Sequence, residues 1–379
     1  MLDADDVTAL LSEVDAFATQ RIAAAVERPE APISHHTLAA LSAEAAELGL
    51  LPAPGADPGY TLWEHCDHAN AMQFNLGLLQ LVARANAGIA FAWHRAALAR
   101  AAAAPAGAPL AGAHPAGTVL DTAIVTTGHL GLARAELARF LRPQGPRADG
   151  ALLSDWLDRR QHPTTVITTA SWQHLVWPVW HDDTIRWQRA TRQQLQVEPC
   201  RAQHGLDELA AFRVRLAPDA DATLLPGDGD TRLAYERVLK LDMLGLMAIG
   251  AGALRHAWEL AAAYAAIRKQ GGKVIGEHPA VQIMLGEMEM AWHQASGALA
   301  RFARPLDDIA LSELAAQRVN THGALCHGAN QGVQVHGGVG YMRDVGAEKI
   351  VRDQNMLRLQ AGGTREIPLL LSGLCGGQP

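Results

Sequence analysis

The first 117 residues carry apolar side chains at the spacing of amphipathic helices. In residues 3–27 they recur every three or four positions, which predicts a helix face that packs against a core. Residues 35–51 repeat this pattern. Residues 72–104 are rich in alanine and predict one long helix. Prolines and glycines between residues 105 and 117 then end the helical part.

Residues 118–229 change to short, β-branched or alternating runs separated by turn residues, which is the pattern of strands. Strands are expected within residues 118–128, 164–172, 175–180, 183–187, 194–199 and 210–218. Two helical stretches, residues 132–141 and 151–160, interrupt them. We therefore expect a middle β domain.

The remaining residues return to helical spacing. Four long helices are expected at about residues 232–269, 279–301, 306–328 or slightly beyond, and 345–357. Four amphipathic helices of this length suggest a bundle. The predicted fold class is α+β multidomain. It comprises an N-terminal helical domain (1–117), a middle β-barrel-like domain (118–229) and a C-terminal four-helix bundle (230–379).

Composition and charge argue against several classes of function. The formal net charge of −7 gives no basic surface for nucleic acid. No uncharged apolar run approaches the roughly 18 residues of a membrane-spanning helix. The acidic N-terminus lacks the basic region of an export signal, and the four cysteines are far apart, so we expect a cytoplasmic protein.

Two short clusters, at residues 65–68 and 322–327, contain His and Cys but no complete ligand set, so no metal site is expected.

Two glycine-rich motifs lie close together near the C-terminus. They form the pattern Q-V-H-G-G-V-G-Y, then R-D, then a hydrophobic run and G-T-R-E-I. This pattern resembles the C-terminal signature of the acyl-CoA dehydrogenases. The matching positions are Gln334, His336, Gly337, Gly338, Gly340, Tyr341, Arg352, Asp353, Gly363, Thr364, Glu366 and Ile367. Residues 245–288 resemble the first two bundle helices of that family, with Arg268 at the arginine of the turn between them.

The resemblance implies a flavoprotein of fatty acid metabolism. In such an enzyme, FAD takes a hydride from the β-carbon of an acyl-CoA thioester while a carboxylate removes the α-proton. The resemblance also implies pairing through the bundle into a homo- or hetero-oligomer, and electron-transfer flavoprotein as the partner of an active enzyme. It places six residues at FAD: Arg268, Gln334, Gly337, Gly338, Thr364 and Glu366.

The sequence departs from the family pattern at the positions of the catalytic base and of the flavin ring. The position of the usual catalytic glutamate is Gly362. Some family members place the base on the first bundle helix, and a count back from Arg268 puts that position at Asp242. The family segments that flank the flavin ring are missing from the middle domain; residues 126–141 and 164–180 stand in their places.

Three functions remain open at this point. The chain is an acyl-CoA dehydrogenase-like flavoprotein with Asp242 as base. Alternatively, it is a catalytically degenerate subunit that binds little or no flavin and completes the FAD site of a competent paralogue. The third is a repurposed member of that family that acts on a carrier-protein thioester or on a non-thioester substrate.

Overall fold

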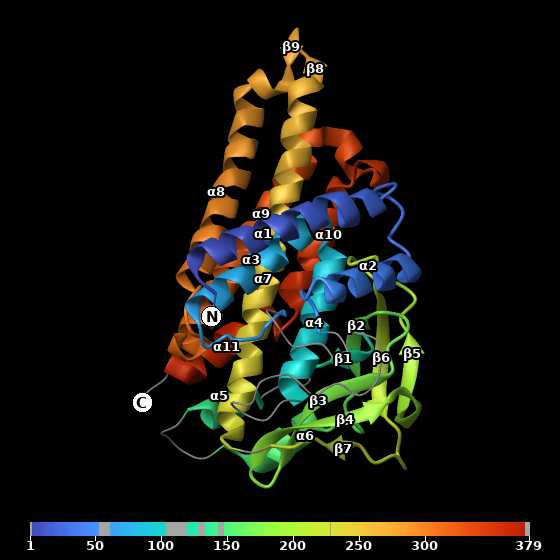
Figure 1. The fold of residues 1–379 in the computed structure, drawn as a ribbon, viewed down its shortest axis with the longest axis vertical. Helices are drawn as coiled ribbons and strands as arrows, with labels where there is room; N and C mark the ends of the chain where they lie inside the picture. The colour runs from blue at the N-terminus through green and yellow to red at the C-terminus, as the bar shows by residue number, and fades with distance from the viewer. Residues whose placement is uncertain are drawn as a thin grey trace.

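Two helical parts and one β part make up the molecule (Figure 1). The computed structural model describes residues 2–52, 61–103, 120–127, 133–142, 148–227 and 229–375. The β part lies at the lower end in Figure 1, and the longest helices rise above it to a small hairpin at the top. This is the α+β architecture predicted from the sequence. The Pro- and Gly-rich stretch at residues 105–117 lies outside the described residues.

The first two helices begin at polar caps. α1 (Ala4–Phe17) starts with a capping box, in which the side chains of Asp3 and Asp6 each accept a hydrogen bond from the other's backbone N–H. The chain then continues as short π and 3₁₀ turns. α2 (His35–Glu47) starts after Ser34, whose hydroxyl accepts a backbone hydrogen bond. The helices thus begin where polar side chains replace the missing backbone acceptors.

The Ala-rich segment forms two helices, so the prediction of one continuous helix is wrong. α3 (Ala69–Ala85) ends and α4 (Ala87–Ala103) begins at Asn86. The backbone of Asn86 is extended, and its Oδ1 accepts a hydrogen bond from the N–H of Ile89. One asparagine therefore supplies the cap that starts α4 inside a run that otherwise favours a helix.

Long helices form the C-terminal bundle. They are α7 (Thr231–Ile267), α8 (Pro279–Arg301), α9 (Leu311–His336) and α10 (Ala347–Leu359). The hairpin β8 (Lys269–Gln270) and β9 (Lys273–Val274) joins α7 to α8. The last helix, α11 (Gly363–Cys375), packs against α9 and against α5 (Ala133–Leu141) of the middle part. α9 continues past Gly328 to His336, because Gly328 and Gly332 lie against side chains of α7 and α8 instead of ending the helix.

The described β part contains two sheets. The first has the order β1-β3-β4-β7, and β1 pairs with β3 in parallel while the other pairs are antiparallel. Its strands are β1 (Thr122–Ile124), β3 (His174–His181), β4 (Thr184–Thr191) and β7 (Thr223–Leu224). The antiparallel second sheet, β2-β6-β5, contains β2 (Thr164–Thr168), β6 (Ala210–Leu216) and β5 (Leu195–Pro199). The helices α5 (Ala133–Leu141) and α6 (Gly150–Leu157) are the two predicted interruptions.

The tryptophans of the β part enter two cores. Trp172 and Trp177 are fully buried in the core between the sheets, whereas Trp187 belongs to the larger core shared with the helices. The β part is therefore anchored to the helical parts through apolar packing as well as through its own core.

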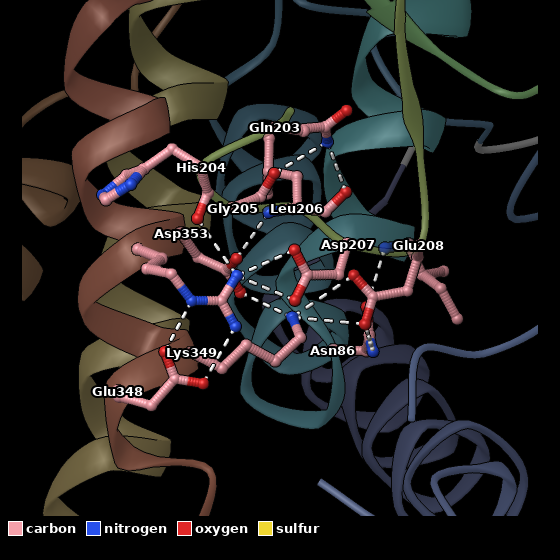
Figure 2. A network of polar contacts seen from close by, with 12 residues as sticks. Asn86, Gln203, His204, Gly205, Leu206, Asp207, Glu208, Glu348, Lys349 and Asp353 are labelled. Atoms are coloured by element: carbon pink, nitrogen blue, oxygen red, sulfur yellow. Dashed lines mark hydrogen bonds and ion pairs between the residues drawn. The ribbon is translucent and has the colours of Figure 1, made fainter. Parts of the chain in front are cut away.

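A buried polar network joins all three parts (Figure 2). Lys349 of α10 donates hydrogen bonds to Asp353 (2.7 Å) and to Glu208 (3.2 Å), which lies just before β6. Glu208 also accepts a hydrogen bond from Asn86, and Asp353 accepts one from the backbone N–H of Leu206. The asparagine that caps α4 thereby also ties that helix to the β part and to the bundle.

Candidate functional site

A cavity of about 790 Å³ lies where the β part meets the C-terminal bundle. Its walls come from four segments that are far apart in the sequence. They are α4, the end of β1 with the residues after it, the β2–β6 pair, and the connection from α10 to α11. The lining includes Arg95, Ile124, Thr126, Thr127, Thr164, Thr165, Val166, Ile167, Arg213, Arg358, Gln360, Ala361, Gly362, Gly363, Thr364, Arg365 and Glu366.

The two middle-domain segments that stand in place of the family's flavin-flanking segments both reach this cavity. Thr126 and Thr127 follow β1, and residues 164–167 belong to β2. Thr165 pairs with Arg213 across the β2–β6 ladder, so the two side chains share one sheet face. Three regions of interest in the sequence, including the Gly-Gly-Thr motif, therefore meet at one place.

The α10–α11 connection turns sharply at the cavity wall. Ala361, Gly362 and Gly363 have φ values of +53°, +93° and +69°. Two glycines make this left-handed path accessible, since side chains disfavour it. The turn brings the N-terminus of α11 to the cavity. An α-helix N-terminus has free N–H groups and attracts anions. The place of the usual catalytic glutamate is thus glycine backbone in a conformation adverse to a side chain.

A buried arginine supports this turn from behind. The Arg318 side chain on α9 is fully buried, and its Nη2 donates to the carbonyl of Leu357 at 2.8 Å. A longer bond of 3.5 Å reaches the carbonyl of Gln360. Burial lowers the pKa of Arg318 to about 9, although the charge of Asp242 acts in the opposite direction. The guanidinium remains charged at neutral pH and holds the end of α10.

Asp242 lies one layer behind the cavity wall. It is fully buried on α7, and its Oδ1 is 2.8 Å from Nη1 of Arg95 and 3.2 Å from Nε2 of His94. Its Oδ2 accepts a hydrogen bond from the hydroxyl of Thr126. Burial raises the pKa of Asp242, but the Arg95 charge and the bonds from His94 and Thr126 outweigh burial and hold that pKa well below its usual range. Asp242 is a poor proton acceptor in this state, and its contacts favour a counter-ion over the predicted base.

The histidine beside Asp242 has a defined tautomer. The Nε1–H of Trp63 donates to Nδ1 of His94 at 3.1 Å, so the ring proton of His94 lies on Nε2 and points to Asp242. Burial lowers the pKa of His94 more than Asp242 raises it, which keeps the ring neutral. The ring fits because Gly245 has no Cβ; a Cβ there would overlap it. Trp63 and Gly245 thereby fix the position of His94, which donates to the carboxylate that orients Arg95.

The cavity wall is cationic. Four of its described side chains are arginines, Arg95, Arg213, Arg358 and Arg365, and one is a carboxylate, Glu366. Arg95 is 8% exposed, whereas the other three arginines are exposed. Arg95 is therefore shielded from water, whereas the other three arginines face solvent.

The predicted cofactor residues form two groups. Thr364 and Glu366 line the cavity. Arg268, Gln334, Gly337 and Gly338 are exposed and do not line it. Arg268 caps the end of α7 beside the β8–β9 hairpin, and Gly337 follows the end of α9. Both helix ends lie toward the top in Figure 1, far from the β part. One chain thus holds only part of the predicted set at its cavity.

Arg95 and Arg213 line the cavity but were not predicted from the sequence. The burial of Arg95 could have been predicted, because the helix around it is apolar on every side and a charged residue in such a helix is buried. Arg213 sits at an alternating polar position of a strand, which by itself indicates only a solvated face. Among the described residues, no group of three or more His, Cys, Asp or Glu could hold a metal ion.

Comparison with known proteins agrees with this architecture. A family model described as "Acyl-CoA dehydrogenase, C-terminal domain" matches residues 231–373. The probable acyl-CoA dehydrogenase YngJ of Bacillus subtilis is 31% identical over 135 residues, which are 34% of this chain and 34% of that protein. A 3-sulfinopropanoyl-CoA desulfinase of Paraburkholderia xenovorans is 29% identical over 136 residues, 36% of this chain and 35% of that protein. The matched segment therefore spans about a third of the length of each relative.

The fold extends beyond the matched segment. The glutaryl-CoA dehydrogenase structure from Mycobacterium smegmatis aligns with 100% of this chain and 96% of its own, with a TM-score of 0.71 and 17% identity. Within the described residues, no helix is long and apolar enough to cross a membrane. Residues 231–373 thus match the acyl-CoA dehydrogenase C-terminal domain, and the chain as a whole shares the fold of the glutaryl-CoA dehydrogenase structure.

Proposed function

We propose that this chain is an acyl-CoA dehydrogenase-type flavoprotein that binds FAD in the 790 Å³ cavity and acts on an acyl-CoA thioester. The observation that carries the proposal is that three segments far apart in the sequence meet at one cavity. The segments at residues 126–127, 164–167 and 360–366, each aligned in sequence with a flavin or base segment of the family, line the same cavity. Chance would not bring three such segments together.

The residues at the cavity fit FAD. The free N–H groups at the start of α11 and the guanidinium of Arg365 suit a pyrophosphate. The hydroxyls of Thr126 and Thr364 and the apolar faces of Val166 and Ile167 suit a polar-edged flat ring. Thr364 and Glu366 would hold the cofactor from this chain. Bound FAD would supply a hydride acceptor for α,β-dehydrogenation.

The chain's own residues would bind and orient the substrate, but they offer little for removal of the α-proton. Gly362 has no side chain, and Asp242 is held as a counter-ion. Among the described residues that line the cavity, Glu366 is the single carboxylate, and its Oε2 lies near Gly363 at the start of α11. Proton removal would thus depend on Glu366, on water or on a substrate that needs no carboxylate base.

A second function is favoured by a separate observation. Arg268, Gln334, Gly337 and Gly338 keep the family pattern yet lie away from the cavity of their own chain. In a mixed oligomer they would complete the FAD site of a catalytically competent paralogue. The paralogue would supply the base, so activity would not require one from this chain. A homo-oligomer would use the same residues at a second copy of the cavity. Electron-transfer flavoprotein would accept the electrons of an active enzyme, and the cytoplasm is the proposed compartment.

Titration with FAD tests the leading proposal. Thr165→Trp fills the cavity from an exposed strand position, and Gln193→Trp places the same side chain at an exposed position outside the cavity lining. We expect the first variant to bind FAD at least about tenfold more weakly than the unchanged protein and the second to bind it equally well. Equal binding by both variants would place the flavin elsewhere. Absence of binding in all three proteins would favour the role in a mixed oligomer.

A further inference from the structure

A second cavity, of about 260 Å³, shares no described lining residue with the first. Its walls come from residues 23–31 after α1, the α3–α4 junction at Asn86, α7 and the start of α10. Most of its described lining residues are small or apolar, among them Ala83, Ala253, Leu260 and Ile350. Because an apolar cavity of about 150 Å³ holds benzene, this volume suits a ligand of roughly ten non-hydrogen atoms.

One end of this second cavity is polar and belongs to the network of Figure 2. Glu208, Lys349 and Asp353 all line it. The side chains of Glu208 and Asp353 are only 1% and 3% exposed, so bulk water does little to screen their charges. Burial raises the pKa of Asp353 and the charge of Glu208 adds to this rise, although Lys349 acts in the opposite direction. The two buried carboxylates therefore compete for one ammonium group.

Negative charge exceeds positive charge around this polar end. Lys349 donates to two carboxylates, and the adjacent Arg352 also donates to two, those of Asp207 and Glu348. Four carboxylates thus share two cations. The N-terminus of α10 contributes only about half a positive charge, which does not restore the balance. A positively charged ligand group at this end would supply the missing counter-charge.

An unused hydrogen-bonding group lies at the same cavity. His256 on α7 lines it and has no hydrogen-bond partner among the described residues. Burial lowers the pKa of His256 more than the charge of Glu259 raises it, so the ring is neutral at pH 7. A neutral imidazole has one nitrogen that accepts a hydrogen bond. The ring can therefore accept an N–H from a ligand.

We infer that this second cavity binds a small molecule with an apolar body and one protonated amine, and that the amine lies at the polar end beside His256, Glu208 and Asp353. The imidazole accepts one N–H of the ammonium group, and the two carboxylates accept others through lone pairs that Lys349 leaves free. The apolar body lies against the alanines and aliphatic side chains of the wall. This site is separate from the flavin cavity and does not depend on the proposed function.

Three probes with the same phenyl ring and two-carbon chain separate charge from shape: 2-phenylethylamine, 2-phenylethanol and phenylacetate. Their dissociation constants are measured by ligand-observed NMR with the full chain, in buffer that contains FAD to compete for the first cavity. We expect the amine to bind at least about tenfold more tightly than the alcohol, because a charge-assisted hydrogen bond is roughly twice as strong as a neutral one. Phenylacetate should bind most weakly, because it adds a carboxylate beside Glu208 and Asp353.

Equal binding of the amine and the alcohol, tighter binding of phenylacetate, or no binding of any probe would each overturn the inference. These outcomes are read from the unchanged protein, so they do not depend on whether a variant folds.

Two neighbouring alanines locate the bound amine. Ala23 and Ala24 lie in the same 3₁₀ turn and both are exposed, but Ala23 lines the second cavity and Ala24 does not. Ala23→Phe should weaken binding of 2-phenylethylamine at least about tenfold, and Ala24→Phe should leave it unchanged. Thr165→Trp, which fills the first cavity, should also leave it unchanged. Binding that survives in Ala23→Phe, or is lost in Thr165→Trp, would show that the amine binds elsewhere and would refute this assignment.

Discussion

Arg95 and Asp242 form an ion pair of 2.8 Å that joins α4 to α7 behind the wall of the cavity. Both side chains are buried, and the pair is extended by neutral His94 and by Thr126. A count along one helix identifies Asp242 as a base, but the structure surrounds its carboxylate with partners that stabilise the charged form. The contacts of Asp242 are thus those of a buried counter-ion, whereas the sequence predicts a base at this position.

Replacement of Asp242 separates these two roles. Asp242→Asn keeps the shape of the side chain but leaves Arg95 buried without its counter-ion, so we expect a loss of about 3–5 kcal/mol in the free energy of unfolding. Urea denaturation measures it. The double variant with Arg95→Met should recover much of the loss. A base would behave differently: the single variant would keep its stability and lose turnover.

Gly245 and Gly286 give a matched test of the His94 position. Both are glycines within long helices, but a Cβ at Gly245 would overlap the His94 ring, and a Cβ at Gly286 would meet nothing within 4 Å. Gly245→Ala should lower the free energy of unfolding by about 1–3 kcal/mol or more, because it displaces His94. Gly286→Ala should raise it by about 0.5–1 kcal/mol through helix propensity. Equal effects would show that the ring has room to move.

Stability should fall as the pH is lowered from 7 to 5. Burial lowers the pKa of His94 and of His256 in the folded protein, with neighbouring carboxylates opposing in both cases. Below the ordinary value of about 6.5 the unfolded chain binds protons that the folded chain does not. Each histidine therefore removes up to about 1.4 kcal/mol per pH unit in that window.

The dependence is measured as the urea midpoint at several pH values. His256→Gln should flatten the curve by the share of one histidine. The exposed substitution His35→Gln should leave the slope unchanged. A flat curve between pH 7 and 5 in the unchanged protein would contradict the neutral state of the buried rings.

Lys349 is the cation of the network in Figure 2, and its removal should loosen all three parts at once. Burial lowers its pKa, but Asp353 and Glu208 raise the pKa more, so the group stays charged. Lys349→Met leaves two buried carboxylates without a cation and should cost about 3–5 kcal/mol in a single cooperative transition. Arg160→Met, which loses a partner on the fully exposed Asp221, should change little. Similar effects of the two variants would refute a central role for Lys349.

Much of the fold follows from local patterns. Strand and helix segments expected in the middle domain are found, and α8 occupies the predicted residues 279–301, because Pro279 at the start of that helix is an unambiguous signal. The break at Asn86 escaped prediction since its cap depends on one side chain, and β7 escaped because it has only two residues. Local spacing finds elements whose periodicity is long enough to stand out.

The site depends on contacts that spacing does not contain. Arg95 meets Asp242 across 147 positions, and their pairing fixes the protonation of a residue that the sequence presents as a free acid. The loop that bears Gly362 was recognised from its glycines, but its position beside Thr126 and Thr165 follows only from the packing of the β part on the bundle. Charge balance within a buried cluster is a property of the folded chain.

The visible absorption spectrum of the purified protein, with its cofactor released by heat and quantified, tests the central claim most directly. The cavity predicts a yellow protein with about one FAD per chain, whose colour bleaches when a suitable acyl-CoA is added. A colourless protein that takes up no flavin from excess FAD would contradict the claim that this chain's cavity is a flavin site.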